Sequence, residues 1–193
     1  MTGHADRAMD EPATLGALLR SDLEAYFAHY GQPGRRARRR DLWRNFLVPR
    51  CAPVALYRLA RTARVSGWNG LAKLLTWVNF YLHGIEISAD CAIGSHFFMP
   101  HANGTVIGAQ SIGHHAVIYH QVTIGAKAVE FEHVGRPRIG NHAFIASGAR
   151  IIGDIELGDN CTVGANAVVT RSAGSDIVLT GIPAKARPKA RED

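Results

Sequence analysis

His101 is the residue of this sequence that is best placed to act as a catalytic acid or base. It belongs to residues 100–105, PHANGT, in which polar residues and a glycine interrupt a regular spacing of apolar residues. An imidazole titrates close to neutrality, so it can take the proton of a hydroxyl group and later pass it to a leaving group. A histidine exposed at a turn is the simpler interpretation, and the residue types alone favour it.

Other histidines and the cysteines raise the question of a metal site. His114 and His120 occupy equivalent positions in successive repeats and could meet symmetry-related copies at a metal ion. No carboxylate or cysteine accompanies them at ligand spacing, so we expect no metal. Cys51, Cys91 and Cys161 lie far apart without a CxxC pair, which argues against a disulfide framework and against a cysteine zinc site.

A six-residue repeat must position these side chains. An α-helix would scatter residues at this spacing around its axis, and glycine, asparagine and aspartate interrupt any long strand. The repeat instead predicts a β-helix whose flat faces each contribute one branched residue to the core, with Cys91 and Cys161 at small core positions. The clearest anchors are Ile139, Ile145, Ile151, Leu157, Val163 and Val169.

The repeat has two breaks. It runs through Ile87, Ile93 and Met99 and resumes at Val106, Ile112, Ile118 and Ile124. The step from Met99 to Val106 is seven residues, one too many, so residues 100–105 should bulge from the coil. The step from Ile124 to Ile139 is fifteen residues, so residues 126–138 should leave the coil as a loop.

A helical region is expected before the β-helix, over residues 1–84, with residues 1–19 disordered. Ser21 precedes Glu24 by three residues, which is the spacing of a capping box. The β-helix should span residues 85–180, and residues 181–193 should form a C-terminal tail.

Two later helical segments end at glycines, Gly67 and Gly84. The second segment carries a wide apolar surface that includes Trp68 and Trp77. We expect this surface to pack on the first coil or on another subunit, rather than on a membrane surface.

Composition and charge restrict the partners. The chain is 47% hydrophobic and 20% charged, which is typical of a globular protein. Its net charge is +6, and six arginines gather in residues 34–44, GRRARRRDLWR, which we interpret as a solvated loop, with an anionic partner as the alternative. No nucleic-acid motif accompanies them, so nucleic-acid binding is not expected. Without a signal peptide or a long apolar run, a cytoplasmic location is expected.

Five segments carry a resemblance to a known family: GIEISADCAIG, PHANGTVIG, VTIG, PRIGNHAFIASGARIIGDIELGDNCTVGANAVVT and GIPAKAR. With them, residues 20–188 resemble the serine acetyltransferase branch of the left-handed β-helix (hexapeptide repeat) acyltransferases. The resemblance implies an all-β left-handed parallel β-helix of hexapeptide repeats preceded by an α-helical N-terminal region. It also implies a homotrimer, with a dimer of trimers as a larger alternative.

The same resemblance implies an O-acetyltransferase that moves an acetyl group from acetyl-coenzyme A (acetyl-CoA) to a small-molecule hydroxyl acceptor. His101 matches the catalytic histidine of the family and is therefore the expected general base. Asn103, in the same segment, is expected to contact the acceptor. The family has an Arg-His-Pro segment in the excursion loop, where this chain has Gly135-Arg136-Pro137, so Arg136 or His133 is expected to replace the missing histidine.

The acceptor stays open at this point. The serine-specific enzymes have an aspartate before the catalytic histidine, where this chain has Pro100. Free serine is one acceptor, and a hydroxyl of a sugar, a polysaccharide precursor or a secondary metabolite is the alternative. A non-catalytic β-helix scaffold is the remaining hypothesis, which His101 and the intact C-terminal segment oppose.

The family binds coenzyme A along the edges of the coil, toward its C-terminal end. Small residues are also what the corners of a coil require, so this assignment rests on the resemblance. The residues expected to line the path are Gly125, Ala126, Ser147, Gly164 and Ala165, with Lys185 and Lys189 for the phosphates.

Overall fold

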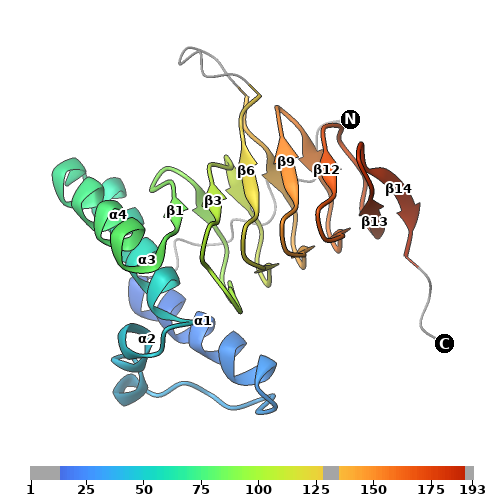
Figure 1. The fold of residues 1–193 in the computed structure, drawn as a ribbon. Coiled ribbons are helices and arrows are strands. Elements are labelled where there is room, and N and C mark those ends of the chain that lie inside the picture. Colours follow the sequence, from blue (N-terminus) through green and yellow to red (C-terminus); the bar gives the residue numbers. More distant parts are fainter. Residues whose placement is uncertain (1–13, 128–134, 190–193) are drawn as a thin grey trace.

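The computed structural model describes residues 14–127 and 135–189, and it consists of a helical part followed by a β-helix (Figure 1). The helical part contains four α-helices and one 3-10 helix. These are α1 (Leu15–His29), η2 (Arg39–Asp41), α2 (Arg44–Leu47), α3 (Ala52–Val65) and α4 (Asn69–His83).

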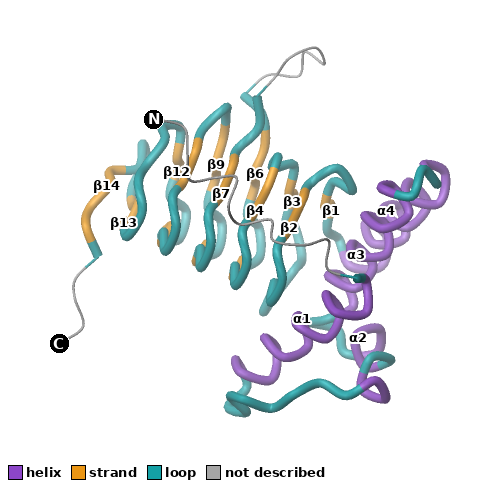
Figure 2. Tube along the Cα trace, turned by 180° about the vertical axis from the view of Figure 1, so that it is seen from behind, coloured by secondary structure: helices purple, strands orange, loops and turns teal. Residues whose placement is uncertain are grey.

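The β-helix is built from short strands that form three sheets, with the orders β1-β3-β6-β9-β12, β10-β7-β4-β2 and β14-β13-β11-β8-β5. The chain visits the three sheets in turn, and the coils stack away from the helices (Figures 1 and 2). The first coil reaches the third sheet only through the bridge of Phe98 with Val117, and the last coil reaches the second sheet only through the bridge of Ala173 with Leu157. The strands are β1 (Glu86–Ile87), β2 (Ala92–Ile93), β3 (Val106–Ile107), β4 (Ser111–Ile112), β5 (Val117–Ile118), β6 (Thr123–Gly125), β7 (Arg138–Ile139), β8 (Phe144–Ile145), β9 (Arg150–Ile152), β10 (Glu156–Leu157), β11 (Thr162–Val163), β12 (Val168–Val169), β13 (Ile177–Thr180) and β14 (Lys185–Pro188).

The residues that recur every six positions form the core of the β-helix. All six anchors from Ile139 to Val169 are buried, with relative exposures between 0% and 3%. Fully burying each such branched side chain contributes about 1.5–3 kcal/mol. Cys91 and Cys161 are fully buried as predicted, and burial raises the pKa of the Cys91 thiol to about 12, as expected of a core residue.

The position of one anchor was predicted wrongly. Val106 is 39% exposed, whereas Ile107 is buried and pairs in register with Ile87. The coil therefore takes two extra residues between Met99 and Ile107, and the next step, from Ile107 to Ile112, is one residue short. Both candidates are β-branched and adjacent, so only strand pairing decides which one points inward.

The N-terminal helix begins earlier than predicted. Residues 1–13 lie outside the described residues, but Leu15 already starts α1, so the disorder expected over residues 1–19 is wrong for its last part. The side chain of Thr14 caps the helix by accepting from the N–H of Ala17. Ser21 is consequently not a cap: its hydroxyl donates to the carbonyl of Leu18 within the helix and accepts from the N–H of His96.

The C-terminal segment is also more ordered than the expected tail. Residues Lys185–Pro188 form β14, which pairs antiparallel with β13, whereas the strand pairs among the coils are parallel. The loop between β6 and β7 starts after Gly125, close to the prediction, and its residues 128–134 lie outside the described part of the chain.

Helix α4 ends at Gly84, which adopts the left-handed conformation (φ 62°) that favours glycine. The predicted apolar surface of this helix does not pack on the first coil, because Trp68 and Trp77 remain 67% and 65% exposed. Within the described ranges, no helix has the length and apolar character needed to cross a membrane.

A buried ion pair joins the helices to the first coil. Arg58 in α3 contacts Asp22 in α1 through two hydrogen bonds of 2.8 and 3.1 Å, and both side chains are almost fully buried. The guanidinium also donates to the carbonyls of Ile93 and Gly94, while Asp22 accepts from the N–H of Phe97. The pair therefore supplies hydrogen bonds that no preceding coil can supply to these backbone groups.

We predict that Arg58→Met lowers the free energy of unfolding by about 3–5 kcal/mol, because it leaves the Asp22 carboxylate buried without a counter-charge. Adding Asp22→Asn should recover part of this loss, since the amide oxygen can still accept from Phe97 without carrying a charge. Urea denaturation followed by circular dichroism measures the free energy of unfolding of the two single variants and of the double variant. If the double variant loses the sum of the two single losses, the two side chains are not coupled.

Candidate active site

The bulge that carries His101 is held between helix α4 and the next coil. The N–H of Gly104 donates to the carbonyl of Gly84 at 2.8 Å, and the carbonyl of Asn103 accepts from the N–H of Gln121 at 3.1 Å. The buried side chain of Thr105 donates to the carbonyl of Tyr119. These bonds fix both sides of the segment, so His101 projects from a defined backbone and is exposed.

Gly84 and the bulge fit closely. The side chain of Asn103 packs where a Cβ on Gly84 would stand, 2.8 Å from its amide nitrogen. The left-handed backbone of Gly84 and this close approach both require glycine. Asn103 is thus held against the end of α4, although it was predicted as an acceptor contact.

Two side chains from the next coil lie beside His101. The ring of His120 stands perpendicular to that of His101, with centroids 5.8 Å apart, and the ring of Tyr119 is 6.3 Å away. The Nδ1 of His120 is buried and has no hydrogen-bond partner among the described residues. From the sequence, His120 was considered only as a metal ligand. Its equivalent corner position in the coil after His101 could have indicated this proximity.

A cleft of about 720 Å³ lies between α4 and the sheet that contains β1, β3 and β6. Gly125, Ala126 and Arg136 line it from the coil, opposite Lys73 and Trp77 of the helix. The Arg136 guanidinium is exposed and donates to the carbonyl of Gly108 at 3.1 Å. The structure thus brings together one residue predicted for the acceptor and two predicted for coenzyme A, whereas His101 does not line this cleft.

The other residues predicted for coenzyme A divide between two corners of the coil. Ser147, Gly164 and Ala165 follow β8 and β11, at the corner where the His101 bulge also lies. Lys185 pairs with Thr180 at the end of β13 that approaches this corner. Lys189 is at another corner, where its ammonium donates to Asn160 at 2.7 Å.

Pro100 and His133 both bear on the choice of acceptor, and of these two the structure describes Pro100. Pro100, which replaces the aspartate of the serine-specific pattern, is buried and offers neither a charge nor a side-chain hydrogen bond. His133 lies outside the described residues.

The bulge has the elements of acyl-transfer chemistry. His101 is an exposed imidazole on a fixed backbone. The N–H groups of Gly104 and Thr105 are already bonded to Gly84 and Ala102. Among the described residues, the N–H groups of His101, Ala102 and Asn103 have no acceptor, and those of Ala102 and Asn103, which follow the imidazole, are the candidates to stabilise an oxyanion.

Comparison with known proteins agrees with this architecture. Residues 136–171 match the family model "Bacterial transferase hexapeptide (six repeats)". The chain is 33% identical over 154 residues to a serine acetyltransferase of Helicobacter pylori, covering 79% of this chain and 90% of that protein. It is also 33% identical over 142 residues to a serine acetyltransferase of Mycobacterium tuberculosis, covering 72% of this chain and 60% of the relative.

Solved structures show the same fold. The serine acetyltransferase of Neisseria gonorrhoeae superposes with a TM-score of 0.80 at 22% identity, covering 93% of this chain and 68% of the other. The soybean serine acetyltransferase complexed with serine gives a TM-score of 0.77 at 26% identity, covering 92% and 70%. The predicted fold class is confirmed, a hexapeptide-repeat β-helix preceded by a helical region. The chain belongs to the serine acetyltransferase family of hexapeptide-repeat transferases.

Proposed function

We propose that this protein transfers the acetyl group of acetyl-CoA to a hydroxyl group of a small acceptor, with L-serine as the first candidate and His101 as the general base. The observation that carries this proposal is a solvent-exposed imidazole held on a bulge, in a chain that belongs to the serine acetyltransferase family. Membership of that family favours an acetyltransferase over the non-catalytic scaffold.

In the proposed reaction, a ring nitrogen of His101 takes the hydroxyl proton of the acceptor as its oxygen attacks the thioester carbon. The intermediate carries a negative oxygen, to which the N–H groups of Ala102 and Asn103 can donate. When the carbon–sulfur bond breaks, the imidazolium returns the proton to the thiolate. The base is then neutral again, and the products are the acetyl ester and free coenzyme A.

His120 is a further candidate for the acceptor site. Its Nδ1 is buried without a partner among the described residues, and its ring approaches that of His101. A buried ring nitrogen that lacks a hydrogen bond is costly, so a turn of the ring that brings Nδ1 to a polar group of a bound acceptor would be favourable.

An acceptor other than serine is the second candidate function. The buried Pro100 cannot supply the contact that an aspartate would make at this position. Arg136 places a guanidinium in the cleft, in the segment where the serine-specific enzymes have a histidine. If free serine needs both of these polar contacts, a site that lacks them loses several kcal/mol of binding free energy for serine. The hydroxyl of a sugar or of another metabolite is therefore the alternative.

The proposal includes a homotrimer, in which the cleft lined by Arg136 faces His101 of a neighbouring copy. Within one chain, His101 precedes β3 and Arg136 follows β6, so the two residues lie at opposite corners of the sheet that contains these strands. A second copy is therefore needed to bring them together. Acetyl-CoA would then lie along the corner that holds Ser147, Gly164, Ala165 and Lys185. A cytoplasmic location also remains a prediction.

Release of free coenzyme A from acetyl-CoA, with L-serine or a panel of sugars as acceptor, tests the proposed function directly. Serine-dependent release, well above a control without acceptor, would establish serine as the acceptor. Release with a sugar alone would keep the chemistry and change the acceptor. If acetyl-CoA does not bind at all, the acetyltransferase proposal is wrong.

His101→Ala should lower kcat by about 10²-fold or more, because the acceptor hydroxyl then keeps its proton during attack. Steady-state kinetics with the established acceptor gives the value. His29→Ala is the matched control: it removes another exposed imidazole, on α1, and should leave kcat near that of the wild type. Full activity in His101→Ala would exclude His101 as the base.

Arg136→Ala should raise the KM of the acceptor while the KM of acetyl-CoA stays nearly unchanged. Arg138→Ala serves as the control, because this arginine instead contacts Gln110 and Asp154 on the outside of the coil. Kinetics with each substrate varied in turn separates the two effects. The reverse pattern, with only the KM of acetyl-CoA raised, would assign Arg136 to the donor site.

A further inference from the structure

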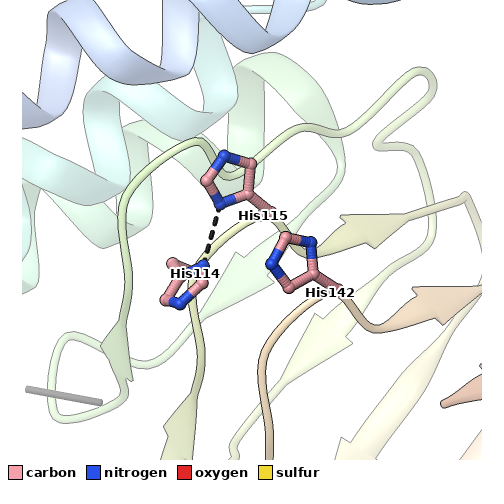
Figure 3. A group of neighbouring side chains, drawn as sticks. All are labelled: His114, His115 and His142. Carbon is pink, nitrogen blue, oxygen red and sulfur yellow. Dashed lines mark hydrogen bonds between the residues drawn. The ribbon is translucent and has the colours of Figure 1, made fainter. Parts of the chain in front are cut away.

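Three histidines gather at a corner of the coil that the proposed reaction does not use. His114 and His115 lie between β4 and β5, and His142 occupies the same corner one coil later, between β7 and β8 (Figure 3). One ring nitrogen from each can be chosen so that all three lie within 4.8 Å of one another. The bulge of His101 lies at a different corner, after the sheet that contains β5 and β8.

The backbone places these rings in a fixed register. The N–H of His115 donates to the carbonyl of Ser95, and the N–H of His142 donates to the carbonyl of His114. The same bond links the N–H of Asn160 to the carbonyl of Asn141 in the coil after that. The second of the two turn residues at this corner therefore stacks on its equivalent in the next coil. The ring of His115 lies nearly parallel to those of His96 and His142, with centroids 4.3 and 4.8 Å apart.

His114 does not perform the structural task of its equivalents in the next two coils. There, Asn141 accepts from the N–H of His114, and Asp159 accepts from the N–H of Asn141. No matching bond from Ser95 N–H to the ring of His114 is present in the described part of the chain. Instead, Nδ1 of His114 turns toward Nδ1 of His115 at 2.8 Å. The fold therefore does not need a histidine at position 114.

The three rings suit a metal ion chemically. Neutral imidazole is the form that binds metals. Zinc–nitrogen bonds are about 2.0–2.1 Å long, so ligand nitrogens in a tetrahedral site lie about 3.3 Å apart. The chosen nitrogens lie within 4.8 Å of one another, and two of the three rings are exposed, so the rings would turn slightly inward to hold the ion.

We propose that His114, His115 and His142 form a binding site for a divalent transition-metal ion of the zinc type, with three imidazole ligands and one position left for water. An all-imidazole set selects zinc, nickel, cobalt or copper over magnesium and calcium, which prefer oxygen ligands. Because the ligands come from two successive coils, the ion would join these coils at their corner.

Zinc binding to the untagged full-length protein tests the site, after treatment with a chelator and competition against a chromophoric zinc indicator. We expect one tight equivalent per chain. His115→Asn and His142→Asn should each weaken binding by about 100-fold or more, since each removes a direct ligand. Both residues have positive φ (59° and 55°), as does Asn160 at the equivalent position (56°), so asparagine fits this backbone.

His29→Asn, on α1, is the matched control and should bind zinc as the wild type does. Thermal unfolding gives a second readout: zinc should raise the Tm of the wild type and of His29→Asn, but not that of His142→Asn. Two outcomes would overturn the site. These are less than one equivalent of zinc per chain, and unchanged affinity in His115→Asn and His142→Asn, which would place the ion on other histidines.

Discussion

The buried contact between Asp22 and Arg58 is the interaction on which the arrangement of the two parts depends. A β-helix satisfies its backbone by stacking each coil on the one before, and the first coil has no predecessor. Arg58 donates to the carbonyls of Ile93 and Gly94, and Asp22 accepts from the N–H of Phe97. Each charge neutralises the other, so the pair can be buried while it serves backbone groups of the coil. Tyr57 adds a bond to the carbonyl of Cys91 from the same helix.

This junction extends to the candidate active site through helix α4. The helix packs closely on α3, and its buried Asn79 donates to the carbonyl of Pro53. At its end, the carbonyl of Gly84 accepts from the N–H of Gly104 inside the bulge. The backbone that presents His101 is therefore held by the helical part as well as by the coil. The helices act as a support for the site, in addition to covering one end of the β-helix.

The sequence predicted the core well because a buried branched residue every six positions has few structural solutions. All anchors from Ile139 to Val169 are where the repeat placed them. It failed at Val106, where two adjacent β-branched residues compete and only pairing with Ile87 selects Ile107. It also failed at Ser21, whose spacing to Glu24 fits a helix start, while Thr14 provides the actual cap seven residues earlier.

The candidate site was less predictable than the fold. The irregular spacing around residues 100–105 located the bulge, and the resemblance assigned His101 to it. The spacing also places His120 two residues after Ile118, as His101 follows Met99, and so could have indicated that the two rings approach each other. It could not show that the ring of His114 turns toward His115, because that depends on the side-chain conformations at the corner. Roles for His101, Asn103, Arg136 and the residues expected to contact coenzyme A stay predictions.

The antiparallel strand β14 has a consequence for the molecule as a whole. A stack of coils ends in exposed strand edges, to which the first coil of another molecule could add and so begin a fibre. Here the outermost strand of one sheet runs against the direction of the coils and carries Lys185, Arg187 and Pro188. Two positive charges and a residue without an N–H make a poor template for a further strand. With the helices at the other end, both ends of the stack are poor places for a further coil to add.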